Sequence, residues 1–126
     1  MPEGKTVLLV DDDLTLREMY EERLKAEGFT IVQATNGEEA LAKAGQIKPN
    51  VILLDIMMPK VNGFDVLKEL KANDELKNVP VIILTALIQD IDRVQGKKLG
   101  AVDYIVKSET MPGEVIAKIK NAIGQK

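Results

Sequence analysis

The sequence predicts an α/β fold: a doubly wound, five-stranded parallel sheet of strand order 2-1-3-4-5, with helices on both faces. Short apolar runs alternate along the chain with segments of helical period. Each run is apolar without interruption, as expected for strands that are covered on both faces. The 126 residues are 45% hydrophobic, enough for one core but not two, so we expect residues 1–126 to form a single domain.

The first strand is predicted at residues 6–10, a continuous apolar run. A helix is expected next, at residues 14–27, and Gly28 follows it in the position of a C-terminal stop. Five of its residues stand at helical spacing: Leu16, Met19, Tyr20, Arg23 and Leu24.

A short second strand is predicted at residues 30–34. Asn36 then stands where a side chain can cap the start of a helix over residues 37–47, which carries a stripe of small and apolar side chains. The third strand, at residues 51–54, is apolar throughout and therefore reads as buried on both faces.

The second half of the chain repeats the pattern. A turn rich in Pro and Gly leads into a helix through Asn73, and the fourth strand is expected at residues 81–84. A helix over residues 88–99 and a fifth strand at 102–106 follow. A last helix is predicted to face the core with Val115, Ile116, Ile119 and Ile123.

Composition narrows the range of functions. The net charge is −3 and no basic run is longer than Lys97-Lys98, so we expect neither nucleic acid nor a membrane as a partner. No apolar run approaches the roughly 20 residues that span a bilayer, and the absence of cysteine favours a cytoplasmic location. The absence of histidine excludes imidazole catalysis and histidine metal sites. A metal would therefore be held by oxygen atoms, which favours Mg²⁺ or Mn²⁺.

Polar residues follow four of the predicted strands. They are Asp11-Asp12-Asp13 after the first strand, Asp55 after the third, Thr85 after the fourth and Lys107 after the fifth. Because parallel strands end at the same edge of a sheet, these side chains are expected to lie together. Neighbouring carboxylates repel one another unless a cation lies among them. A divalent ion beside a lysine and a hydroxyl suits a phosphoryl group, and an aspartate in that setting can attack phosphorus.

Most of these residues also have a simpler structural interpretation. Asp13 is best explained as the N-cap of the first helix, which leaves Asp11 and Asp12 unexplained. An unpaired acid at the end of a buried strand, such as Asp55, costs on the order of several kcal/mol, so a functional role is favoured. Thr85 alone could satisfy a backbone group, and a lysine alone is most often a surface residue.

The segments VLLVDDD, VILLDIMMPKVNG, VIILTA and GAVDYIVK resemble those of response-regulator receiver domains. The resemblance covers essentially the whole chain, in order and spacing. It implies that Asp55 accepts a phosphoryl group from a sensor histidine kinase or a phosphotransfer protein. It also implies that Mg²⁺ is held by Asp12, Asp55 and the backbone carbonyl of Met57, with Asp11 completing the acidic pair.

The resemblance further implies two-component phosphorelay signalling rather than turnover of a substrate. Thr85 and Lys107 would contact the phosphoryl oxygens, and movement of Thr85 would couple to rotation of Tyr104. That switch would reshape the surface of the fourth helix, fifth strand and fifth helix, to which an unidentified target protein binds. Judged alone, Tyr104 reads as a half-buried aromatic.

Two departures from the family pattern affect the predicted site. Ser108 follows Lys107 where the family usually has a proline in a cis bond, and a non-proline cis bond costs roughly 2.5–4 kcal/mol. The sequence leaves the conformation of this bond open. Met57 and Leu87 stand two residues beyond Asp55 and Thr85, and both are apolar. We hypothesise that they hinder the hydrolytic water and give a long-lived phosphoryl form.

Three other functions are compatible with parts of the sequence. Residues 11–15 fit the D-x-D-x-T signature of haloacid-dehalogenase-like phosphatases, in which Asp11 would be the nucleophile and Asp13 the general acid/base. The order of the remaining acids and the length of 126 residues argue against this enzyme. A flavodoxin-like cofactor carrier would need a phosphate-binding loop after the first strand, and none is evident. A non-phosphorylated interaction module is favoured only if the acidic site is incomplete.

Overall fold

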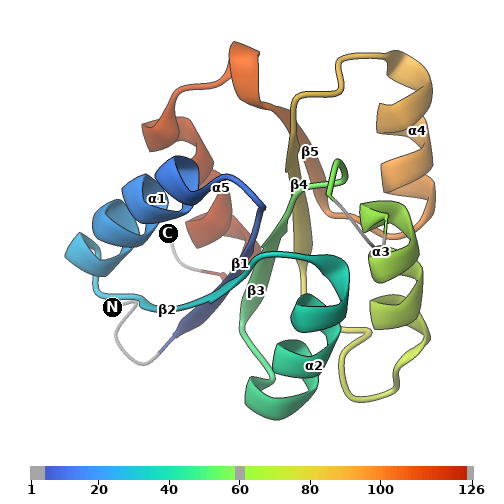
Figure 1. Cartoon of the computed structure of the whole chain (residues 1–126), viewed down its shortest axis with the longest axis horizontal. Helices are drawn as coiled ribbons and strands as arrows, with labels where there is room; N and C mark the ends of the chain where they lie inside the picture. Colours follow the sequence, from blue (N-terminus) through green and yellow to red (C-terminus); the bar gives the residue numbers. More distant parts are fainter. Residues whose placement is uncertain (1–4, 59–61, 125–126) are drawn as a thin grey trace.

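The structure, a computed structural model, describes residues 5–58 and 62–124 as strands that alternate with helices (Figure 1). The strands are β1 (Thr6–Val10), β2 (Thr30–Ala34), β3 (Val51–Leu54), β4 (Val81–Thr85) and β5 (Asp103–Val106). The helices are α1 (Leu14–Ala26), α2 (Gly37–Ile47), α3 (Gly63–Ala72), α4 (Asp90–Lys98) and α5 (Pro112–Ala122), with a short 3₁₀ turn, η1 (Lys107–Glu109), before α5. None of these helices is both long and apolar enough to cross a bilayer.

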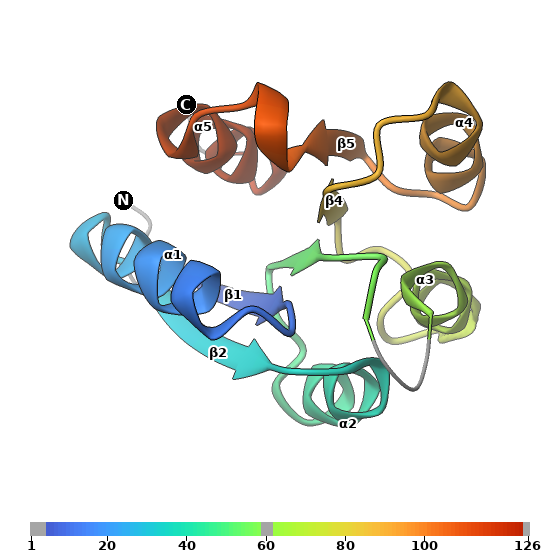
Figure 2. The ribbon, with the colours of Figure 1, turned by 45° about the horizontal axis from the view of Figure 1, so that its top comes forward.

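The five strands form one parallel sheet in the order β2-β1-β3-β4-β5, which confirms the predicted topology. Figure 2 shows α1 and α5 on one face of the sheet and α2, α3 and α4 on the other. The strand order reverses at β1, where the chain crosses to β2 on one side and to β3 on the other. Ligand sites in such sheets lie at the carboxyl edge beside this point.

Side chains that alternate along each strand fill a core on either face of the sheet. Val7 and Leu9 of β1 pack with α1 and α5, whereas Leu8 and Val10 pack with the helices of the opposite face. Both sets are fully buried, which explains why the strand sequences are apolar without interruption. The buried centre of this sheet supports the loops that carry the polar residues.

Several predicted helix ends are confirmed. The Asp13 carboxylate accepts the Leu16 N–H, and the Asn36 side chain accepts the Glu39 N–H. Gly28 has a positive φ of 97°, which an L side chain adopts only with strain.

The fourth helix begins two residues later than predicted. Leu87 lies in the loop before it, where its N–H donates to the Thr85 hydroxyl (3.4 Å) and its carbonyl accepts the Tyr104 hydroxyl (3.1 Å). Gln89 is extended, with φ −77° and ψ 142°, so α4 begins at Asp90. The contact with Tyr104 of β5 therefore overrides the local helical pattern.

The buried face of α1 differs from the set of residues at helical spacing that the sequence indicated. Arg23 is exposed, whereas Arg17 is buried beside Tyr20 and Leu24. These three buried residues are spaced at i, i+3 and i+7, so they share one helical face.

Candidate functional site

The carboxyl edge of the sheet brings the predicted polar residues together. Val10 of β1 is paired with Leu54 of β3, so the residues that follow them, Asp11 and Asp55, are neighbours across these strands. One carboxylate oxygen each from Asp11, Asp12 and Asp55 lies within 4.8 Å of the others. Asp11 is 1% exposed and Asp55 is 4% exposed, whereas Asp12 faces solvent.

Lys107, directly after β5, provides the positive charge at this edge. Its Nζ lies 2.9 Å from Asp11 Oδ2 and 3.1 Å from Asp55 Oδ2, so one ammonium group serves two buried carboxylates. Burial raises the pKa of Asp11, and the hydrogen bonds from Lys107 and from the Asp13 amide only partly offset it. Burial acts to lower the pKa of Lys107, but the two acids outweigh it and the pKa is raised. The site therefore carries an excess of negative charge.

Backbone amides hold the other oxygen of each buried acid. Asp11 Oδ1 accepts the Asp13 N–H at 2.9 Å, and Asp55 Oδ1 accepts the Met57 N–H at 3.1 Å. Both acids are thus fixed in orientation, with one oxygen toward the lysine and one toward the backbone of the following loop. The peptide bond between Lys107 and Ser108 is not cis, which settles the conformation that the sequence left open.

Thr85 and Tyr104 hold the same loop residue. Thr85 is completely buried at the end of β4, and its hydroxyl accepts the Leu87 N–H, while Tyr104 donates to the Leu87 carbonyl. Tyr104 is 3% exposed, more buried than the half-buried position expected from the sequence. Arg93 of α4 lies over its ring, 5.3 Å from the centroid, and Gly96 leaves the space the ring occupies. The ring is therefore enclosed by α4.

The donor set fits a hard divalent cation. Three carboxylates lie close to one lysine, so negative charge on carboxylate oxygens is left unbalanced. Oxygen ligands suit Mg²⁺ or Mn²⁺ rather than a soft metal. A hollow of about 450 Å³ opens beside Asp12. It is lined by Asp12, Ile56, Met57, Met58, Asn62, Phe64, Leu87 and Asp92. The two apolar residues predicted to flank the site, Met57 and Leu87, thus share this hollow.

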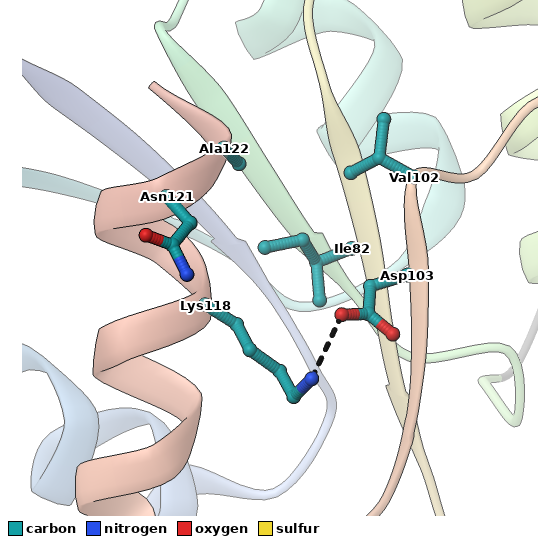
Figure 3. A pocket seen from close by; sticks show the side chains of 6 residues that line it. All are labelled: Ile82, Val102, Asp103, Lys118, Asn121 and Ala122. Atoms are coloured by element: carbon teal, nitrogen blue, oxygen red, sulfur yellow. Dashed lines mark hydrogen bonds and ion pairs between the residues drawn. The ribbon is translucent and has the colours of Figure 1, made fainter. Parts of the chain in front are cut away.

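A second hollow, of about 220 Å³, lies near the amino ends of β4 and β5, against the end of α5 (Figure 3). It is lined by Ile82, Val102, Asp103, Lys118, Asn121 and Ala122. Lys118 Nζ lies 3.0 Å from Asp103 Oδ2, so its one acid is matched by one base. With balanced charge and no convergent acids, this hollow lacks the chemistry of the acidic site.

Arg17 is a side-chain contact to the acidic site that sequence reasoning missed. Its guanidinium donates to the main-chain carbonyl of Asp11 at 2.8 Å. The spacing of Arg17 from Tyr20 and Leu24 was the available signal, because it places Arg17 on the buried face of α1.

The profile of the family "Response regulator receiver domain" matches residues 7–120 of the chain. The CpxR homolog of Haemophilus influenzae, a transcriptional regulatory protein, is 47% identical over 114 residues, which cover 90% of this chain and 48% of the relative. The chain spans about half the length of the curated relatives it matches.

Solved structures give the same likeness. A putative response regulator from Chloroflexus aurantiacus has a TM-score of 0.90 and 31% identity, covering 98% of this chain and 100% of that one. The Mn²⁺-bound form of the response regulator Rcp1 has a TM-score of 0.83 and 29% identity, covering 94% of this chain and 93% of that one.

Proposed function

The chain belongs to the response regulator receiver domain family, and from this premise we propose that Asp55 accepts a phosphoryl group in a Mg²⁺-dependent reaction. A receiver domain takes part in two-component signalling and is not an enzyme that turns over a substrate. One observation carries the proposal. Asp55 is buried against Lys107 and a backbone amide, with two further acids close by. A carboxylate kept in that costly setting has a chemical role rather than a packing role.

Asp11, Asp12, Asp55 and the backbone carbonyl of Met57 would hold the metal ion. When bound, Mg²⁺ neutralises charge on the phosphoryl oxygens and on the acids around them. The chain itself provides the orientation, because the Met57 amide and Lys107 hold the Asp55 carboxylate at the end of β3. The related Rcp1 structure was determined with Mn²⁺ bound, which supports a divalent ion at this kind of site.

In the transfer step, an Asp55 carboxylate oxygen forms a bond to phosphorus. The bond from phosphorus to the donor atom breaks, and the donor keeps that electron pair. Lys107 already contacts Asp55, so a phosphoryl group carried there would bring its oxygens within reach of the ammonium group. The Thr85 hydroxyl, on the neighbouring strand, would donate to another oxygen.

The 126 residues contain no histidine that could donate the phosphoryl group, so the donor lies outside them. From membership of the receiver family, we propose that it is a sensor histidine kinase or a phosphotransfer protein. The output would be a change in the surface formed by α4, β5 and α5, read by a target protein. Leu87 connects the two ends of this switch, since both Thr85 and Tyr104 hydrogen-bond to it. A Thr85 hydroxyl that turned toward the phosphoryl group would release the Leu87 amide and alter the loop that Tyr104 holds.

The phosphatase alternative is disfavoured by the geometry as well as by the family. Asp13 would have to act as general acid/base, yet its carboxylate caps α1 by accepting the Leu16 N–H.

The test is intact mass and peptide mapping after incubation with acetyl phosphate, with and without Mg²⁺. We expect one phosphoryl group on Asp55, only with Mg²⁺, and none on Asp55→Asn. Asp103→Asn is the matched control, because Asp103 is also an acid paired with a lysine but lies near the opposite edge of the sheet. Label on Asp11, or label that survives Asp55→Asn, would support the phosphatase, and no label at all would support a silent interaction module.

A further inference from the structure

Arg17 is a buried cation whose charge is met by hydrogen bonds rather than by an ion pair within the described part of the chain. It is 8% exposed on the face of α1 that packs against the sheet. Its Nε donates to Gln33 Oε1, and its Nη1 donates to the Asp11 main-chain oxygen, both at 2.8 Å. Burying a guanidinium is costly unless its hydrogen bonds are made, so these two contacts define where it can sit.

The carbonyl that Arg17 binds belongs to the peptide group between Asp11 and Asp12. The Asp11 N–H is also fixed, since it donates to the Ala34 carbonyl at 3.1 Å. A peptide group is planar, so holding its oxygen sets the direction in which the chain enters Asp12. The Asp12 carboxylate faces solvent and makes no hydrogen bond to another described residue. Its position therefore depends on the backbone that Arg17 holds.

The stem-side nitrogen of the guanidinium, Nε, is also anchored. Gln33 of β2 accepts from Arg17 and donates through Nε2 to Glu21 Oε2 at 2.8 Å. Glu21 lies one turn beyond Arg17 on α1 and is also paired with Lys25 at 3.3 Å. Because Gln33 must accept at one atom and donate at the other, its amide has a single orientation, and this orients the guanidinium toward Asp11.

We propose that Arg17 is a positioning residue for the metal site, which pre-organises Asp12 as a ligand by holding the Asp11–Asp12 peptide group. The inference rests on the proposed function of the acidic site as a Mg²⁺ site. Groups that orient metal ligands typically change metal affinity 10- to 100-fold when removed. Arg17 acts through an uncharged carbonyl, so we expect the lower end of that range.

The experiment is calorimetric titration of the whole chain with Mg²⁺ alone, for wild type, Arg17→Met, Arg17→Lys and Leu24→Val. We expect Arg17→Met to raise the Mg²⁺ Kd about tenfold. Arg17→Lys keeps the charge and can reach the Asp11 carbonyl without the fork to Gln33, so it should restore part of the affinity. Leu24→Val is the matched control. Leu24 is fully buried on the same helix, so this substitution weakens the packing of α1 without removing a contact to Asp11.

The outcomes separate this inference from the function on which it rests. A wild-type chain that binds no Mg²⁺ overturns the proposed function itself. A wild type that binds while Arg17→Met stays within twofold of Leu24→Val overturns the positioning role alone. If Arg17→Met does not fold, the comparison of Arg17→Lys with Leu24→Val decides, and a wild-type Kd in Arg17→Lys counts against the proposal.

Discussion

The two ends of the same sheet each carry an Asp–Lys ion pair, and the pairs differ in what surrounds them. At the carboxyl edge, Lys107 lies about equally close to Asp11 and Asp55, which are almost completely buried. Near the amino edge, Lys118 is paired with Asp103 and with no other acid among the described residues. The distance is nearly identical, 3.0 Å, and both side chains are partly exposed.

Ion-pair distance therefore does not distinguish a functional site from a structural contact in this molecule. The difference lies in the balance of charge and in burial. At the carboxyl edge, one lysine is shared by two buried aspartates, and Asp12 is a third acid close by. Near the amino edge, one lysine is paired with one aspartate. An excess of buried negative charge is stable only if a further cation or a proton joins it.

Removing each lysine gives the largest expected difference between the two pairs. In EDTA, Lys107→Met should lower the free energy of unfolding by about 3 kcal/mol, because it leaves two buried carboxylates without a cation. Lys118→Met should cost at most about 1 kcal/mol, since that pair is partly exposed. Urea denaturation of both variants measures this, and equal losses would mean that the acidic edge is no more costly than the other.

Mg²⁺ should stabilise the folded protein through the acids of the carboxyl edge and not through Asp103. At a Mg²⁺ concentration of 100 times Kd, binding raises the free energy of unfolding by about 2.7 kcal/mol. We expect Asp12→Asn to lose most of this gain at the same concentration, because it removes a ligand charge. Asp103→Asn should keep it. Thermal unfolding with and without Mg²⁺ measures both, and a gain that survives Asp12→Asn would remove Asp12 from the metal site.

Much of the fold could be predicted because each local signal agreed with the next. The strands β1, β2 and β3 and the helix α2 have the bounds that were expected, and the strand order followed from the parallel topology. The acidic cluster was also predictable, since parallel strands deliver their last residues to one edge.

The errors lie where tertiary contacts decide. The start of α4 was misplaced because Tyr104 of β5 holds the Leu87 carbonyl in the preceding loop, and this contact is not visible in local sequence. Arg17 was passed over because the groups that accept its hydrogen bonds lie outside α1, whereas Arg23, which stands at helical spacing, is exposed. The buried Arg17 is tolerated only because Gln33 and the Asp11 carbonyl accept from it, which requires the folded sheet.

Polar substitutions should change the lifetime of the phosphoryl form only when they are made at the acidic edge. Met57 is 53% exposed beside Asp12, and Val102, at the other hollow, is 52% exposed. We expect Met57→Asn, alone or with Leu87→Asn, to shorten the lifetime of the phosphoryl form several-fold, because a polar group there can orient water. Val102→Asn should leave the lifetime unchanged. Mass spectrometry after removal of acetyl phosphate follows the decay, and an unaltered, rapid loss in the Met57 and Leu87 variants would refute the shielding hypothesis.

The smallest expected effect is the pH dependence of the metal-free protein. Burial raises the pKa of Asp11 above its unfolded value of 3.8, so the folded state binds a proton more readily than the unfolded chain. The resulting stability is fully present below pH 3.8 and is lost as pH rises through the folded pKa. Wild type should therefore lose stability relative to Asp11→Asn as pH rises across that window. Urea denaturation of both proteins in EDTA gives the difference at each pH, and a difference that changes in the opposite direction would mean that Lys107 outweighs burial at Asp11.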